Sequence, residues 1–139
     1  MLLISACLVG INCKYNGKNN LNEELKKLVD EGKAIPICPE QMGGLPTPRV
    51  PSEIIKNESG NIRVITKDGR DVTKEYKQGA TRALKIAKAL NINRAILKLK
   101  SPSCGCGKIY DGTFSGKLID GNGITTQLFL ENGIEVIGR

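Results

Sequence analysis

The chain has 139 residues, a formal net charge of +7, and no histidine or tryptophan. The absence of histidine excludes imidazole bases, triads of the serine-protease kind and every zinc site that needs a histidine ligand. The positive charge favours an anionic partner such as a nucleotide or RNA, although a basic surface can also serve solubility alone. The length is typical of one domain with its own core, so we expect residues 1–139 to form a single domain.

The start of the chain resembles a lipoprotein signal only superficially, because it has neither the basic start nor the long apolar stretch of such a signal. No apolar run approaches the length of a membrane span. We therefore expect a cytoplasmic protein with no membrane contact. In that reducing compartment the five cysteines are not expected to form a disulfide framework.

The first half of the chain predicts a β-α-β unit. Apolar runs predict strands over residues 2–6 and 34–38, and helically spaced leucine and valine predict a helix over 22–31. The two strands should be parallel, with a right-handed crossover. Residues 39–53 contain four prolines and Gly43-Gly44, which predict a stiff loop. Because this loop directly follows the second strand, we favour the wall of a ligand site over an ordinary surface crossing.

The second half of the chain continues the alternation. Residues 62–66 predict a strand of a small peripheral excursion, with a hairpin turn at 67–70. Thr73 is predicted to cap a long helix that runs through Leu90. One face of this helix is basic, and it is either simply solvated or a nucleic-acid contact. The remaining predicted elements are a strand over 95–100, a hairpin over 108–118, a helix over 124–131 and a strand over 134–137.

Four core strands thus alternate with three helices. This order predicts a three-layer α/β fold of the Rossmann or flavodoxin-like kind: an open, mainly parallel sheet with helices on both faces and a small hairpin excursion. Cys7, Cys38 and Cys104 each follow one of the predicted strands. In a parallel sheet the three thiols would emerge along the carboxyl edge, where open α/β sheets bind ligands.

Thiolates without imidazole partners are soft ligands that suit iron–sulfur clusters, zinc or copper(I). A cluster held by three thiolates would leave one iron without a protein ligand, and such an open position can bind substrate as a Lewis acid. Cys104 and Cys106 point to opposite sides of an extended chain, so we do not expect both to bind one metal. Buried structural cysteines and a redox thiol pair are the alternatives.

Three groups of motifs resemble the DUF523 family, in order, over nearly the whole chain. They are SACLVG at 5–10 with CKYNG at 13–17; CPE at 38–40 with GGLP at 43–46 and PR at 48–49; and SPSCG at 101–105 with IYDG at 109–112 and FSG at 114–116.

This family includes the TudS thiouracil desulfidases. The resemblance implies a [4Fe-4S] cluster held by Cys7, Cys38 and Cys104, with Cys13 as the second choice for the first ligand. Cys106 occupies a position that we expect to vary in the family. The implied activity is removal of sulfur from a thiolated pyrimidine, such as thiouracil or 4-thiouridine monophosphate, with release of sulfide and no net redox chemistry. A related form acts on thiolated tRNA, so tRNA is a possible partner.

In the implied reaction, water activated by a carboxylate attacks the thiocarbonyl carbon. Glu40 is the predicted base, with a solvated loop glutamate or helix cap as the alternative. Ser101 is predicted to orient water or the pyrimidine edge, or else only to cap the turn before Pro102. Asp111 is a second acid/base candidate, although an Asp-Gly pair usually forms a turn. The predicted substrate contacts are Arg49, which suits a phosphate, together with Gly43, Gly44 and Ser103.

Two other function classes are compatible with the same residues. In the first, the thiolates hold a structural metal and the basic helix binds RNA without catalysis. In the second, the protein is a sulfur carrier that uses a cysteine persulfide and no metal. Serine variants distinguish them, because the enzyme should need all three thiolates and the carrier only one or two.

Overall fold

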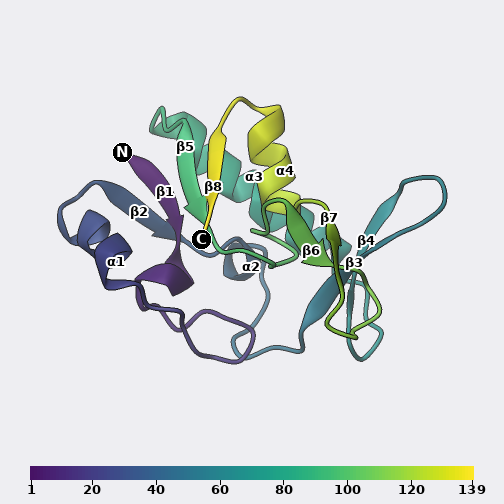
Figure 1. Ribbon diagram of the computed structural model, residues 1–139. Coiled ribbons are helices and arrows are strands. Elements are labelled where there is room, and N and C mark those ends of the chain that lie inside the picture. Colours follow the sequence, from purple (N-terminus) through teal and green to yellow (C-terminus); the bar gives the residue numbers. More distant parts are fainter.

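A computed structural model describes residues 1–139 and contains a four-stranded parallel sheet with the order β2-β1-β5-β8 (Figure 1). Its strands are β1 (Leu2–Ser5), β2 (Ala34–Ile37), β5 (Arg94–Leu97) and β8 (Glu135–Gly138). The predicted α/β class with a mainly parallel sheet is confirmed. The strand order reverses at β1, and ligands of open α/β sheets bind at such a point, beyond the carboxyl ends of the strands.

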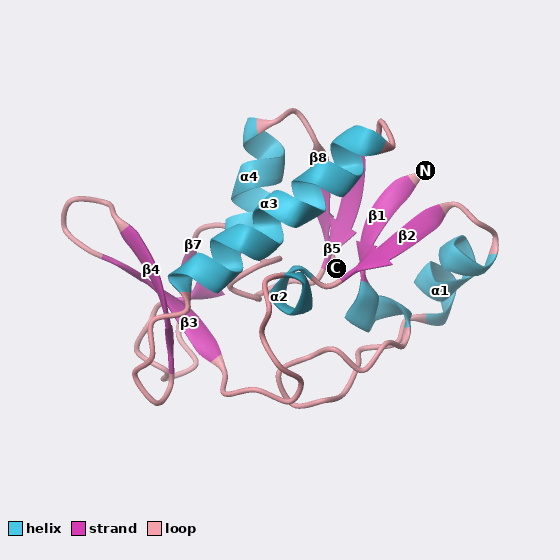
Figure 2. Cartoon of the chain, turned by 180° about the vertical axis from the view of Figure 1, so that it is seen from behind, coloured by secondary structure: helices cyan, strands magenta, loops and turns pink.

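Helices cover both faces of this sheet. Successive strand residues point to opposite faces, and the residues that point to each face are apolar. Leu3 and Leu97 pack on one face with α3 (Thr73–Ala89) and with Phe129 of α4 (Ile124–Glu131). Ile4 and Ile96 pack on the other face with α1 (Glu23–Asp30) and the short 3-10 helix η1 (Ala6–Val9). Figure 2 shows the long α3 and α4 side by side over their face. None of the helices combines the length and the apolar character needed to cross a membrane.

Two antiparallel hairpins lie beside the sheet. One is β3 (Ser52–Lys56) with β4 (Ile62–Thr66), and the other is β6 (Lys108–Tyr110) with β7 (Leu118–Asp120). The second hairpin and β4 were predicted, whereas β3 was not, because its first residues were assigned to the proline-rich loop. The turn after β4 does not lead into another strand. The chain that follows the turn pairs with β4 only through a single antiparallel bridge between Ile65 and Asp71.

The prediction that Thr73 caps α3 is wrong. The capping position is Val72, which offers no side-chain acceptor. Asp71 instead accepts the Thr73 backbone N–H at 2.9 Å, and the Thr73 hydroxyl accepts the Val64 backbone N–H at 2.8 Å. Thr73 therefore joins the helix to β4. All cations of the predicted basic face are exposed: Lys74, Lys77, Arg82, Lys85 and Lys88.

The predicted stiff loop contains a short helix, α2 (Pro39–Met42), that packs closely against α3. Glycine permits this approach on both sides. A Cβ atom on Gly43 would lie 2.0 Å from the Glu75 carbonyl oxygen, and one on Gly79 would lie 1.9 Å from the Pro39 carbonyl oxygen. The contact fixes the position of Glu40, which lies in the first turn of α2.

Replacing Gly79 by alanine is expected to lower the free energy of unfolding by up to about 2 kcal/mol. The new methyl group must push α2 away from α3, which costs about 1–3 kcal/mol, and the ~1 kcal/mol by which alanine favours a helix over glycine offsets part of this cost. Denaturant unfolding followed by circular dichroism measures the change, with the exposed Lys85→Ala of the same helix as control. Equal stability of the two variants would contradict the close packing.

Candidate active site

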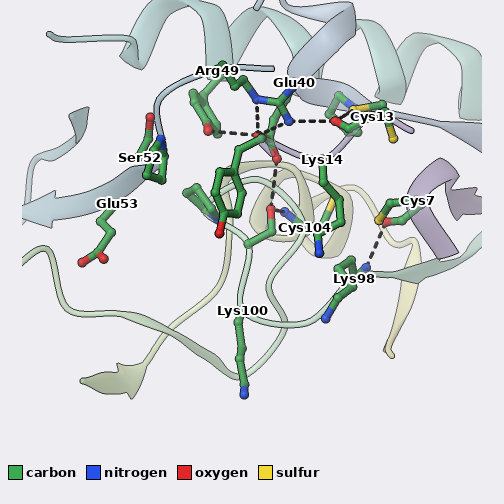
Figure 3. A pocket seen from close by; sticks show the side chains of 18 of the residues that line it. Cys7, Cys13, Lys14, Glu40, Arg49, Ser52, Glu53, Lys98, Lys100 and Cys104 are labelled. Atoms are coloured by element: carbon green, nitrogen blue, oxygen red, sulfur yellow. Dashed lines mark hydrogen bonds and ion pairs between the residues drawn. The ribbon is translucent and has the colours of Figure 1, made fainter. Parts of the chain in front are cut away.

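A cavity of about 600 Å³ lies at the carboxyl ends of β1, β2 and β5, and four cysteines line it: Cys7, Cys13, Cys38 and Cys104. Cys7 lies in η1 just after β1, Cys38 directly follows β2, and Cys104 lies in the loop after β5. The parallel sheet thus brings together thiols that are far apart in the sequence. Figure 3 shows Cys7, Cys13 and Cys104 around this cavity.

Cys13, Cys38 and Cys104 hold their protons firmly, because the pKa of each of these thiols is raised. The pKa of Cys13 is raised to about 11, because its hydrogen bond with Cys7 and its burial outweigh the opposing effect of its hydrogen bond with Cys38. The hydrogen bond with Cys13, followed by burial, raises the pKa of Cys38 far above its usual range. Burial raises the pKa of Cys104 to about 12. A bound metal would lower the pKa values of the thiols that bind it, since its positive charge displaces their protons.

The donor set fits a soft, multi-iron group better than a single ion. The cavity presents several thiols and no imidazole, which is the ligand chemistry of iron–sulfur clusters. No three of the Cys, Asp and Glu side chains are close enough to share one metal ion. A cluster places its ligands on different irons, so its thiolates need not converge on one point.

Glu40 is the centre of a polar network beside the thiols. Its Oε2 accepts hydrogen bonds from Arg49 Nε and Nη2, at 3.1 and 2.8 Å, and from the Tyr76 hydroxyl at 3.2 Å. Its Oε1 accepts one bond, from the Ser101 hydroxyl at 3.2 Å. The Glu40 side chain is only 15% exposed. It is therefore a held carboxylate inside the cavity, not a solvated loop residue (Figure 3).

Arg49 is fully engaged within the protein. Its side chain is 6% exposed and ion-paired with Glu40. Its other contacts are the carbonyl oxygens of Cys13 and Pro46, at 3.0 and 3.1 Å, and the Thr47 hydroxyl at 3.1 Å. These partners together engage every nitrogen of the guanidinium. Arg49 therefore orients Glu40 and the Cys13 backbone. All of its N–H groups are already hydrogen-bonded, so none is free to bind a phosphate.

Ser101 connects the base candidate to the cysteine loop. Its hydroxyl oxygen accepts the backbone N–H groups of Ser103 and Cys104, at 3.0 and 2.9 Å, while it donates to Glu40. The same residue thus caps the turn around Pro102 and contacts the carboxylate. The capping role is therefore present in the structure, whereas the orientation of water or of the pyrimidine edge by Ser101 stays a prediction.

Four predicted site residues lie outside this cavity. Asp111 accepts hydrogen bonds from Thr113, which lower the pKa of the Asp111 carboxyl group, and it lines a second cavity. Gly43 belongs to the contact between α2 and α3, and Gly44 follows it with a φ of 94°. Ser103 is 1% exposed and hydrogen-bonded to the Thr125 hydroxyl at 2.8 Å. Cys106 is partly buried and likewise does not line the cavity.

The cavity also has a basic lining that the sequence reasoning missed: Lys14, Lys67, Lys98 and Lys100. None of these lysines forms an ion pair. The two carboxylates of the lining, Glu40 and Glu53, already have partners. The available signals were that Lys14 lies within the CKYNG motif and that Lys98 and Lys100 shortly precede the motif around Cys104. The cavity is therefore positively charged toward a ligand, and Lys14, Lys98 and Lys100 are drawn in Figure 3.

Three comparisons with known proteins extend over essentially the whole chain. A family model described as 2-thiouracil desulfurase matches residues 2–139. The uncharacterized protein YbbK of Bacillus subtilis (strain 168) is 49% identical over 144 residues, covering 100% of this chain and 95% of that protein. A solved structure described as the [4Fe-4S]-dependent thiouracil desulfidase TudS matches with a TM-score of 0.90 and 42% identity, covering 99% of this chain and 89% of that chain.

Proposed function

Because the chain belongs to the 2-thiouracil desulfurase family, we propose that it is a [4Fe-4S]-dependent desulfidase acting on a thiolated pyrimidine. The reaction replaces the thiocarbonyl sulfur with the oxygen of water and releases sulfide, with no net oxidation or reduction. The observation that carries this proposal is the cavity in which thiols from three strand ends lie beside a carboxylate that is held by hydrogen bonds.

Cys7, Cys38 and Cys104 are the proposed cluster ligands. Each follows a different strand of the parallel sheet, so the fold itself holds the three thiols around the cavity. When bound, the cluster supplies a Lewis acid at the iron without a protein ligand, where a thiocarbonyl sulfur can bind. Cys13 stays outside this set and interacts with Cys7 and Cys38 from the loop that follows η1.

Glu40 is the proposed general base. Arg49 and Tyr76 hold its Oε2, whereas Oε1 has a single donor, Ser101. Oε1 therefore retains a lone pair that can accept a proton from water. Glu40 returns this proton to the departing sulfur, and the proton of the new hydroxyl group is lost to solvent as the carbonyl forms. The products are the carbonyl compound, hydrosulfide and one proton, and Glu40 is regenerated. Asp111 has no part in this proposal, because it lies in the second cavity.

The charge of the cavity favours a nucleotide over a free base. Lys14, Lys67, Lys98 and Lys100 have no carboxylate partner, and a monophosphate supplies the missing negative charge. Arg49, in contrast, is committed to Glu40. We therefore assign phosphate binding to the lysines and name a 4-thiouridine monophosphate-type nucleotide as the substrate class.

Sulfide release from 4-thiouridine monophosphate, 2-thiouracil and thiolated tRNA by anaerobically reconstituted protein tests this function. We expect the highest kcat/KM with the nucleotide. A colourless protein that holds zinc and releases no sulfide would contradict the proposal and favour a structural metal site. Turnover that needs no metal would contradict it in favour of a persulfide carrier.

Lys100→Gln is expected to raise the KM for 4-thiouridine monophosphate about fivefold, corresponding to ~1 kcal/mol, because one phosphate contact is lost. The KM for 2-thiouracil, which has no phosphate, should stay within about twofold. Steady-state kinetics on both substrates measure the difference, and Lys85→Gln on the exposed face of α3 is the matched control. An equal change for both substrates would show that Lys100 does not contact the phosphate.

A further inference from the structure

The aromatic side chains of this chain are concentrated at one place. The sequence contains three tyrosines, two phenylalanines and no tryptophan. Phe129 is fully buried in the core, and the other four aromatic residues line the cysteine cavity: Tyr15, Tyr76, Tyr110 and Phe114. Aromatic faces bind planar rings by stacking. This distribution points to recognition of a planar heterocycle.

Phe114 is the member of this group without a polar atom. Tyr76 is 2% exposed and its hydroxyl is bonded to Glu40, so it belongs to the framework of the base. Tyr15 lies in a loop, and its backbone carbonyl oxygen accepts the backbone N–H of Arg49 at 2.7 Å. Phe114 is partly exposed at the end of the β6–β7 hairpin and can offer a ligand only the face or edge of its ring.

The backbone of Phe114 adopts an unfavourable conformation that the surrounding structure enforces. Its φ is 56°, in the left-handed region that bulky residues rarely occupy. Such strain persists only where neighbouring contacts over-determine it, and it is frequent at functional sites. Gly112, two residues earlier, has a φ of 93° and packs so closely on β3 that a Cβ atom would lie 2.9 Å from the Ile54 carbonyl oxygen.

Glu53 is the residue that holds this loop. Its Oε1 accepts the backbone N–H of Gly112 at 2.9 Å and that of Phe114 at 3.1 Å. Glu53 is only 8% exposed and has no ion-pair partner, so these two hydrogen bonds compensate for its burial. Figure 3 shows Glu53 on the opposite side of the cavity from Cys7. The cysteines thus form one wall of the cavity, the thiol wall. The opposite wall includes the loop of Phe114, which is held by the hydrogen bonds to Glu53.

We infer that Phe114 stacks on the pyrimidine ring of the substrate, and that Glu53 is a positioning residue that fixes Phe114 in place. The inference rests on the proposed function. Its physical content is that the ring is held between the thiol wall and Phe114, so that the thiocarbonyl carbon lies within reach of water at Glu40. Stacking of this kind contributes ~1–3 kcal/mol per base.

The test compares reconstituted variants by two readouts: the Kd for uridine monophosphate from calorimetry, and kcat and KM for sulfide release. Uridine monophosphate lacks the sulfur, so its binding reports contacts to the ring and phosphate. Phe114→Leu should raise the Kd and the KM about 5- to 30-fold, while Phe114→Tyr stays within about twofold of wild type. Glu53→Ala should reproduce the effect of Phe114→Leu, whereas Glu53→Gln restores binding because its amide oxygen still accepts N–H groups.

Leu118→Ala, an exposed position on β7 of the same hairpin, is the matched control and should bind like wild type. The visible spectrum of each variant checks that it holds the same cluster as wild type. Wild-type binding by both Phe114→Leu and Glu53→Ala would overturn the role of Phe114 while leaving the desulfidase intact. No sulfide release from wild type would instead overturn the proposed function together with this inference. If Phe114→Leu fails to fold, the comparison of Glu53→Ala with Glu53→Gln decides in the same way.

Discussion

Replacing any one of Cys7, Cys38 and Cys104 by serine is expected to abolish sulfide release and to remove most of the bound iron. A serine hydroxyl is a hard, weakly acidic donor and cannot replace a soft thiolate on iron. Each of the three thiols reaches the cavity from a different strand, so the loss of one leaves its side of the cluster without a thiolate from that strand. Iron and acid-labile sulfide analysis, visible absorbance and the sulfide assay measure the three losses.

The other two cysteines supply the controls. Cys106→Ser changes the same loop as Cys104 but a side chain outside the cavity, so it should keep both iron and activity. Cys13→Ser should also keep the cluster, since a hydroxyl can maintain hydrogen bonds to the two neighbouring thiols. Full iron content in Cys7→Ser, with loss in Cys13→Ser, would reassign the first ligand to Cys13. Activity that survives in two of the three ligand variants would favour a persulfide carrier.

Glu40→Gln is expected to lower kcat about 10²- to 10⁴-fold while the cluster stays bound, because the amide cannot accept a proton from water. The substitution preserves the size of the side chain and an oxygen that can accept from Arg49 and Tyr76. Steady-state and single-turnover sulfide release give the rate, and the visible spectrum gives the cluster content.

Glu31→Gln, at the end of α1 and away from the cavity, is the matched control for the loss of one carboxylate. We expect its kcat to equal that of wild type. If Glu40→Gln retained kcat within a few fold, Glu40 would not be the base. If it lost iron together with activity, Glu40 would have a structural role in the cavity and the rate change would say nothing about proton transfer.

The sequence was sufficient for the parallel sheet, because strands and helices alternate with clear periodicity and the β-α-β rule then fixes their relative direction. It also indicated that Cys7, Cys38 and Cys104 would lie at one sheet edge, and the structure places all three in one cavity. The location of these cysteines could be predicted because a residue that directly follows a strand lies at the edge of the sheet whatever the details of packing.

The prolines hid two elements from the sequence reasoning. The helix α2 is too short to show a helical period, and β3 begins directly after Pro51. The helix α2 is stabilised by contacts with α3, which is distant in the sequence, and β3 is stabilised by its pairing with β4 in a hairpin. The same limit applies to Arg49, whose partner Glu40 follows from the path of the loop and not from any local pattern.

Residue type alone was a poor guide to substrate contacts. Gly43 is explained by the approach of α2 to α3, and Ser103 is bonded to Thr125 inside the protein. Asp111 stabilises the turn that contains Thr113. Conversely, Glu53 belongs to none of the motifs quoted above, and Phe114, which begins the FSG motif, was not predicted to contact the substrate. Their relation depends on a hydrogen bond between residues 61 positions apart.

Diffraction at the iron edge from anaerobic crystals grown with uridine monophosphate tests the central claim most directly. We predict a four-iron cluster bonded to the Sγ atoms of Cys7, Cys38 and Cys104, with the fourth iron free of protein ligands and facing the pyrimidine ring beside Glu40. A fourth cysteine ligand on that iron, or a cluster held outside this cavity, would contradict the account.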